Sequence, residues 1–84
     1  MNNPAITVYT TPACPQCTTT KRWLDKRGVT YNTVDLSQSP DDMEAVKALG
    51  YSAAPVVIVA NGGYEAHWSG FRPDMLAEHL AAAV

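Results

Sequence analysis

The chain has 84 residues, of which 46% are hydrophobic and 17% charged, and its formal net charge is −2. This length accommodates a single domain, residues 1–84. The acidic balance leaves no basic stripe for nucleic acid, and no apolar run approaches the length of a membrane-spanning helix, so we expect neither nucleic acid nor a membrane as a partner.

The first half of the chain predicts two strands and a helix between them. Residues 5–10 are rich in β-branched and aromatic residues and predict a strand, which Thr11-Pro12 ends. A helix is predicted to begin at the cysteines, because Pro15 suits the first helical position, where its missing N–H costs nothing. This helix runs to about residue 27, and Gly28 is a natural left-handed stop. Residues 30–36 predict the second strand.

The second half predicts a helix, a hairpin and a last helix. Ser39 is predicted to cap a helix that Gly50 closes. Residues 55–60 form a continuous apolar run, which predicts a strand buried on both faces. Asn61-Gly62 predicts a hairpin turn into a strand over 64–68, and Pro73 opens the last helix.

The element order is therefore β-α-β-α-β-β-α, which predicts an α/β fold. The crossover helix makes the first two strands parallel, and the hairpin makes the last two antiparallel. Helices are then expected on both faces of a four-stranded mixed sheet. Ligands of such sheets bind beyond the carboxyl ends of strands and at helix N-termini, which is where the cysteines fall.

Cys14 and Cys17 are the only cysteines, and their spacing predicts thiol–disulfide chemistry. Cys14 falls at the N-cap of the first helix, where unpaired backbone N–H groups and the helix dipole favour a thiolate and lower the pKa. Cys14 is therefore predicted to be the nucleophile. Cys17, at the third helical position, is expected to point inward and to resolve the mixed disulfide.

Metal binding is the alternative from another class. A zinc site needs four ligands, and only His67 and His79 remain, at a spacing unlike that of a zinc finger. A Cu(I) carrier on two thiolates is chemically sensible, but that class has a β-α-β-β-α-β order. We therefore predict no metal site. The start, Met1-Asn2-Asn3-Pro4, lacks the features of a signal peptide, so we expect a cytoplasmic redox protein.

Four segments give the chain a family resemblance. The strand, C-x-x-C and helix resemble the thioredoxin-fold superfamily, and more narrowly the chain resembles the NrdH-type redoxins, which are glutaredoxin-like proteins with thioredoxin-like activity. The segments that carry this resemblance are Cys14-Pro15-Gln16-Cys17, Thr20-Lys21-Arg22, Ala54-Pro55-Val56-Val57 and Trp68-Ser69-Gly70-Phe71-Arg72-Pro73-Asp74-Met75.

The resemblance implies a thioredoxin fold of the glutaredoxin-like kind and a role as a dithiol–disulfide carrier. It implies a monomer that donates electrons to the large subunit of class Ib ribonucleotide reductase. No cofactor would be bound, because electrons would come from NADPH through a flavin-dependent thioredoxin reductase.

The resemblance also implies a set of site residues. Cys14 and Cys17 would form the redox-active disulfide, and Pro55 would follow a cis peptide bond and face the cysteines. The residues expected to border the active site and to bind partners are Pro12, Pro15, Gln16, Ala54, Pro55, Trp68, Ser69, Gly70, Phe71 and Arg72.

A glutathione-dependent glutaredoxin is the alternative within the same class. Glutaredoxins hold glutathione with Thr-Val before the cis-proline and with Gly-Gly followed by an Asp near the last helix. Here those places hold Ala53-Ala54 and Ser69-Gly70-Phe71-Arg72, so the groups that would bind the tripeptide are absent or reversed in charge. Reduction by glutathione is therefore disfavoured.

Overall fold

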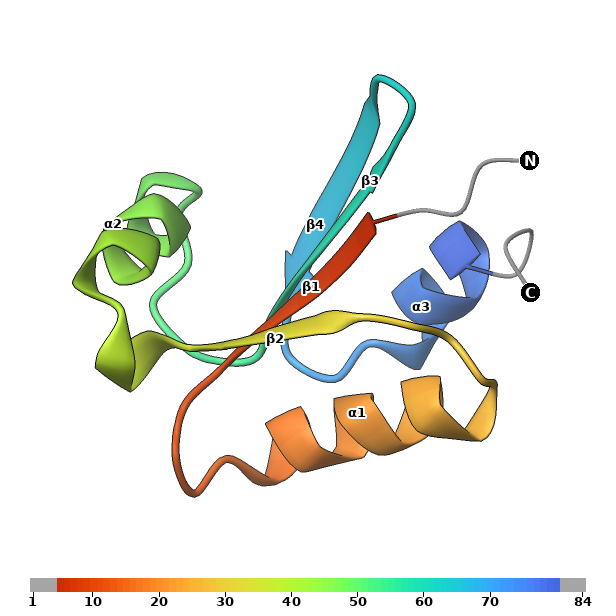
Figure 1. Ribbon diagram of the computed structural model, residues 1–84, viewed down its shortest axis with the longest axis horizontal. Helices are drawn as coiled ribbons and strands as arrows, with labels where there is room; N and C mark the ends of the chain where they lie inside the picture. The colour runs from red at the N-terminus through yellow and green to blue at the C-terminus, as the bar shows by residue number, and fades with distance from the viewer. Residues whose placement is uncertain (1–4, 81–84) are drawn as a thin grey trace.

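The computed structural model describes residues 5–80, so the chain start that bears on export, residues 1–4, lies outside the described range. These residues form a four-stranded sheet with three α-helices (Figure 1). The elements are β1 (Ala5–Thr10), α1 (Pro15–Lys26), β2 (Asn32–Asp35), the 3-10 helix η1 (Leu36–Gln38), α2 (Pro40–Ala48), β3 (Val56–Asn61), β4 (Tyr64–Ser69) and α3 (Pro73–Leu80).

The sheet has the strand order β2-β1-β3-β4, and its pairing confirms the predicted topology. β1 is parallel to β2, whereas β1 with β3 and β3 with β4 are antiparallel. Val57 in β3 pairs with Val8 on one side and with Trp68 on the other. Because β1 and β3 are antiparallel, the last residues of β1 and the first residues of β3 lie at the same end of the sheet, where α1 begins.

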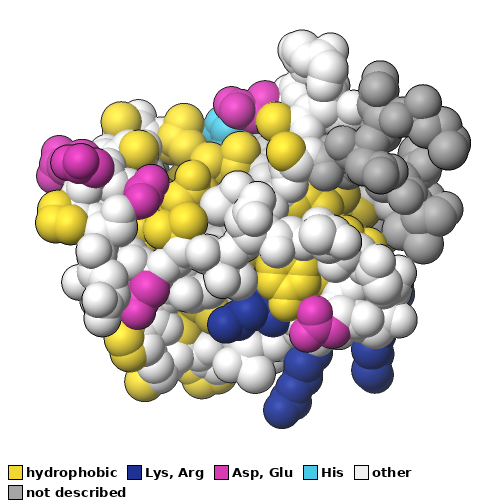
Figure 2. All heavy atoms as spheres, viewed as in Figure 1, with side chains coloured by type: hydrophobic (Ala, Val, Ile, Leu, Met, Phe, Trp, Pro, Cys, Tyr) yellow, Lys and Arg dark blue, Asp and Glu magenta, His cyan; other side chains and the backbone are white. Residues whose placement is uncertain are grey.

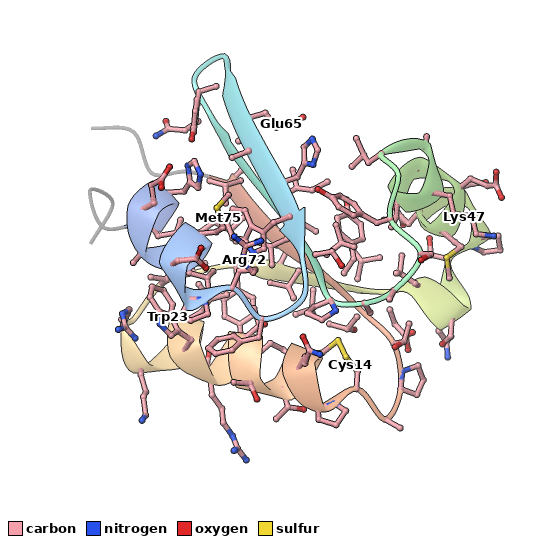
Figure 3. All side chains as sticks on the ribbon, turned by 180° about the vertical axis from the view of Figure 1, so that it is seen from behind. Cys14, Trp23, Lys47, Glu65, Arg72 and Met75 are labelled. Carbon is pink, nitrogen blue, oxygen red and sulfur yellow. A yellow bond between two sulfur atoms is a disulfide. The ribbon has the colours of Figure 1, made fainter. Side chains whose placement is uncertain are left out.

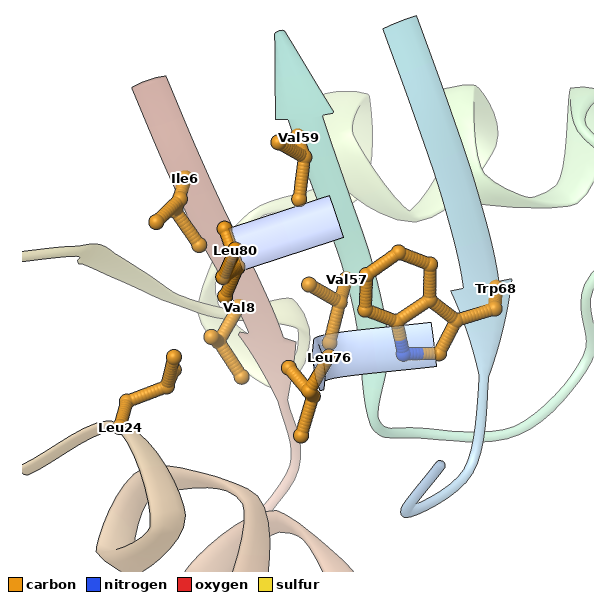
Figure 4. Close-up of a cluster of buried hydrophobic side chains, with 8 residues drawn as sticks. All are labelled: Ile6, Val8, Leu24, Val57, Val59, Trp68, Leu76 and Leu80. Carbon is orange, nitrogen blue, oxygen red and sulfur yellow. The ribbon is translucent and has the colours of Figure 1, made fainter. Parts of the chain in front are cut away.

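Two hydrophobic clusters hold the helices against the sheet. The larger one lies between the sheet and helices α1 and α3 and contains Ile6, Val8, Leu24, Val57, Val59, Trp68, Leu76 and Leu80 (Figure 4). The smaller one lies on the α2 side and contains Leu36, Val46 and Val56. Period-two alternation along β1 sends Ile6 and Val8 to the first cluster and Tyr9 to the second. Helices therefore cover both faces, as predicted.

The second strand is shorter than the predicted range of 30–36. β2 begins at Asn32 and ends at Asp35, whose carboxylate accepts a hydrogen bond from the Ser37 N–H at 2.9 Å and turns the chain into η1. Tyr31 lies outside the strand because pairing with β1 starts at Asn32, opposite Thr7. The Tyr31 hydroxyl donates a hydrogen bond to Asp25 at the end of α1, at 2.8 Å. Burial and this bond raise the pKa of Tyr31 to about 12.

Two further local predictions need correction. Ser39 stands at the N-cap of α2, but it makes no capping bond, because its hydroxyl donates to the Asp42 carboxylate instead of accepting from a backbone N–H. The hairpin turn consists of Gly62 and Gly63, one residue later than predicted. Both glycines have positive φ, at 55° and 89°, and Asn61 therefore belongs to β3.

Charged side chains are unevenly placed over the surface. Four of the six Lys and Arg residues lie in α1 or at its C-cap: Lys21, Arg22, Lys26 and Arg27. α2 carries the acidic residues Asp41, Asp42 and Glu44. Figure 2 shows the cations at the lower edge of the molecule and acidic groups at the α2 side. Within residues 5–80, no helix combines the length and the apolar character needed to span a bilayer.

Candidate active site

The cysteines lie where the turn after β1 enters α1, and they are joined in a disulfide (Figure 3). Cys14 is the N-cap, with extended backbone angles of φ −114° and ψ 98°, and Pro15 is the first helical residue. The Cys17 N–H donates to Cys14 Sγ at 3.1 Å. A sulfur that accepts a helix N-terminal N–H gains stabilisation of its negative form. The predicted placement of both cysteines is confirmed.

The two cysteines differ in their exposure to solvent. Cys17 is only 2% exposed, whereas Cys14 is partly exposed. Pro12 and the two residues between the cysteines, Pro15 and Gln16, are also exposed. An incoming group therefore meets Cys14 before it can reach Cys17.

The turn before β3 is bonded to the loop after β4. The Ala54–Pro55 peptide bond is cis, as the resemblance implied, and Pro55 is buried. The Pro55 carbonyl accepts a hydrogen bond from the Gly70 N–H at 2.8 Å. The Ala53 carbonyl accepts another from the Ser69 hydroxyl at 3.2 Å. The cis-proline turn and the start of the loop after β4 are thus bonded to each other.

A third bond ties the same loop to the cysteine helix. Gln16 Oε1 accepts a hydrogen bond from the Phe71 N–H at 2.9 Å. Gly70 has a φ of 85°, and a Cβ built there would lie 3.2 Å from Gln16 Oε1. The structure therefore brings together three predicted segments, residues 14–17, 54–55 and 69–71.

Three threonine hydroxyls support the first turn of α1, and of these residues the sequence singled out only Thr20, as part of a segment that carries the family resemblance. Thr18, Thr19 and Thr20 donate to the carbonyls of the residues four positions earlier. Those acceptors are Cys14, Pro15 and Gln16, so every carbonyl from Cys14 to Gln16 has a hydroxyl partner. The sequence signal is the threonine triplet one turn after the motif, because threonine readily bonds back to the carbonyl four residues earlier.

Two of the predicted site residues stand apart from the cysteines. Trp68 is 3% exposed and belongs to the larger core, where its ring stacks on that of His79. The Arg72 guanidinium bonds both carboxylate oxygens of Asp74, at 3.1 and 2.9 Å. This pair raises the pKa of Arg72 and lowers that of Asp74. The Arg72 side chain is therefore held at the first turn of α3.

The two histidines have tyrosine partners, which the sequence did not reveal. The Tyr51 hydroxyl bonds His67 Nδ1 at 2.8 Å, and the Tyr64 hydroxyl bonds His79 Nδ1. Both pairs also contact through their rings. Among residues 5–80, no group of three His, Cys, Asp or Glu side chains is placed to hold a metal ion.

Substituting Gly70 tests how much the Gln16 contact matters for stability. Gly70→Ala is expected to cost about 1–2 kcal/mol for a positive φ, and up to about 1 kcal/mol more where its Cβ pushes Gln16 Oε1 off the Phe71 N–H and that hydrogen bond is lost. Gly63→Ala is the matched control, since its φ is 89° and a Cβ there meets nothing within 4 Å. Urea unfolding of the oxidised proteins measures the loss in free energy of unfolding for each of the two variants. Equal losses would show that the Gln16 contact contributes nothing.

A disulfide at a helix start, with one accessible and one buried cysteine beside a cis-proline, can be made and broken by exchange with a partner's sulfurs. This arrangement on a mixed four-stranded sheet defines the class of thiol–disulfide oxidoreductases.

Comparison with known proteins narrows this class. The glutaredoxin family profile matches residues 6–64. The glutaredoxin-like protein NrdH of Escherichia coli (strain K12) is 40% identical over 83 residues, which cover 93% of this chain and 98% of that one. The NrdH protein of Lactococcus lactis subsp. cremoris (strain MG1363) is 34% identical, covering 87% of this chain and 96% of its own. The chain belongs to the glutaredoxin family and, within it, to the NrdH group of glutaredoxin-like proteins.

Solved structures agree with this assignment. NrdH-redoxin from Escherichia coli, whose structure was described as the basis of a thioredoxin-like activity profile, superposes with a TM-score of 0.77 at 40% identity. That match covers 88% of this chain and 92% of the other. Thioredoxin f from spinach chloroplast, at 19% identity, gives a TM-score of 0.71 over 98% of this chain and 77% of its own, and supports the fold alone. The predicted thioredoxin fold is confirmed.

Proposed function

We propose that the reduced Cys14–Cys17 pair donates electrons to the large subunit of class Ib ribonucleotide reductase and is re-reduced from NADPH by a flavin-dependent thioredoxin reductase. One observation favours thioredoxin reductase over glutathione as the reductant. Residues 53–54 and 69–72 lack the glutathione-binding groups of glutaredoxins, and the polar groups of residues 69–71 are bonded to Ala53, Pro55 and Gln16. The thioredoxin-like activity profile of the related Escherichia coli NrdH-redoxin supports the same choice.

The electron transfer is a pair of exchange steps. The Cys14 thiolate attacks one sulfur of the partner's disulfide, forming a mixed disulfide and releasing the other partner sulfur as a thiolate. The Cys17 thiolate then attacks Cys14 Sγ and releases the second partner sulfur. Two electrons pass to the partner, two protons from the dithiol end on its thiols, and the Cys14–Cys17 disulfide re-forms.

The assignment of roles follows from exposure and hydrogen bonding. Cys14 is the accessible residue, and its sulfur accepts the Cys17 N–H at 3.1 Å, so it is the nucleophile. Cys17 is 2% exposed, so it resolves the mixed disulfide from within. In this proposal the protein acts in the cytoplasm as a monomer, and no cofactor binds to it because the flavin stays in the reductase.

The reductant is tested by supplying each candidate separately to the oxidised protein. We expect NADPH with thioredoxin reductase to sustain reduction of a protein disulfide, followed as loss of NADPH absorbance. Glutathione with glutathione reductase is expected to sustain it at least about tenfold more slowly, the cost of one missing charge-assisted hydrogen bond. Turnover by glutathione and not by thioredoxin reductase would refute the proposal.

The electron acceptor needs a separate experiment. In a mixture of NADPH, thioredoxin reductase and class Ib ribonucleotide reductase, adding this protein is expected to sustain deoxyribonucleotide formation over many turnovers. Without it, product formation should stop once the dithiols initially present in ribonucleotide reductase are spent. Equal product with and without the protein would exclude this acceptor.

A further inference from the structure

We propose that Gln16 determines the choice of reductant, because its amide oxygen occupies the Phe71 N–H and so keeps this backbone donor from binding a carboxylate of glutathione. This inference rests on the proposed function, in which thioredoxin reductase rather than glutathione supplies the electrons. It concerns a single contact between the cysteine segment and the loop after β4.

The loop after β4 has few polar groups that a ligand could use. The Ser69 hydroxyl is bonded to the Ala53 carbonyl, and the Gly70 N–H to the Pro55 carbonyl. The Arg72 guanidinium is bonded at two points to Asp74. These bonds join the loop to the cis-proline turn and to the start of α3, so an incoming ligand would have to break structure that holds the loop in place.

The Phe71 N–H differs from these groups. Its acceptor is the end of a flexible, exposed side chain, Gln16, which comes from the residue between the two cysteines. The backbone of the loop does not depend on that acceptor in the way it depends on the Pro55 carbonyl. Removing the Gln16 amide therefore uncovers a backbone donor beside the disulfide while the bonds to residues 53 and 55 persist.

Glutathione has the chemistry to use such a donor. Its thiolate attacks Cys14 Sγ, forming a glutathione–Cys14 mixed disulfide and releasing Cys17 as a thiolate. A second glutathione thiolate attacks the first glutathione's sulfur, giving glutathione disulfide and the Cys14 thiolate, and the two protons lost by glutathione end on the cysteines. The tripeptide carries a carboxylate at each end, and a carboxylate bound by a backbone N–H makes a strong, charge-assisted hydrogen bond.

Gln16→Ala is the variant that tests this inference. We expect turnover by glutathione with glutathione reductase to rise about tenfold, the effect of one hydrogen bond to a charged group, mainly as a lower KM for glutathione. Gln38→Ala is the matched control, because Gln38 is the only other glutamine and lies exposed in η1, on the α2 side of the sheet. It should turn over glutathione at the wild-type rate.

A second variant and a spectroscopic measurement separate the hydrogen bond from other effects. Gln16→Glu keeps an acceptor for the Phe71 N–H, so its glutathione turnover should stay at or below the wild-type rate. Amide hydrogen exchange, read by NMR at Phe71, should be faster in Gln16→Ala and unchanged in Gln16→Glu.

The outcomes distinguish this inference from the proposed function. If wild-type protein is turned over by glutathione and not by thioredoxin reductase, the proposed function fails. If wild type resists glutathione and Gln16→Ala resists it equally, the Gln16 inference alone is overturned, whether or not exchange at Phe71 changes. A rise in Gln38→Ala equal to that in Gln16→Ala would also overturn it.

Discussion

Cys14→Ser is expected to lower disulfide reduction to the uncatalysed rate. A serine hydroxyl is almost entirely protonated near neutral pH, so the helix N-terminus has no anionic nucleophile to stabilise. The buried Cys17, 2% exposed, is a poor substitute because a partner's disulfide cannot reach it. The measurement is NADPH consumption with thioredoxin reductase and a protein disulfide as acceptor.

Cys17→Ser is the matched control, and it should fail in a different way. Cys14 can still attack, so the mixed disulfide with the partner should accumulate as a covalent complex on a non-reducing gel and disappear on adding dithiothreitol. The double variant should form no complex. A stable complex formed by Cys14→Ser instead would reverse the roles of the two cysteines.

Leu24→Ala is expected to cause the largest loss of stability. Leu24 is fully buried in the core between α1 and the sheet, and truncating such a leucine costs about 2–5 kcal/mol. A domain of this size has about 5–15 kcal/mol in total, so Tm should fall by more than about 10 °C. Thermal unfolding of the oxidised protein, followed by circular dichroism, measures the change.

Leu49→Ala serves as the control for this prediction. Leu49 is 38% exposed at the end of α2, so the same truncation should change the free energy of unfolding by no more than about 0.5 kcal/mol. If the two variants were equally destabilised, the core between α1 and the sheet would not be the main source of stability.

The sequence predicted most of the fold because residues with strong local preferences mark the element ends. Pro15 begins α1, and Gly28, at φ 67°, follows its C-cap. The second strand is shorter than predicted because Thr30 and Tyr31 have high β-propensity but lie before the first residue that pairs with β1, Asn32. Local preference there does not decide where the strand begins, because the register with β1 does.

The candidate site was predicted less completely. The cysteines follow from spacing and helix position, whereas the cis-proline and the loop after β4 came from family resemblance. The bond between Gln16 and Phe71 joins residues 55 positions apart, and neither residue type demands the other. The two tyrosine–histidine hydrogen bonds were not predicted for the same reason, because a hydroxyl and an imidazole can each bond many kinds of partner.

The unequal size of the two hydrophobic clusters has a consequence for how the molecule tolerates change. Eight buried residues hold the sheet to α1 and α3, and three hold it to α2. Brief local opening is therefore expected to start at α2, while α1, which carries the cysteines, stays packed on the sheet. Core substitutions under α1 should therefore disturb the redox-active cysteines more than substitutions under α2 do.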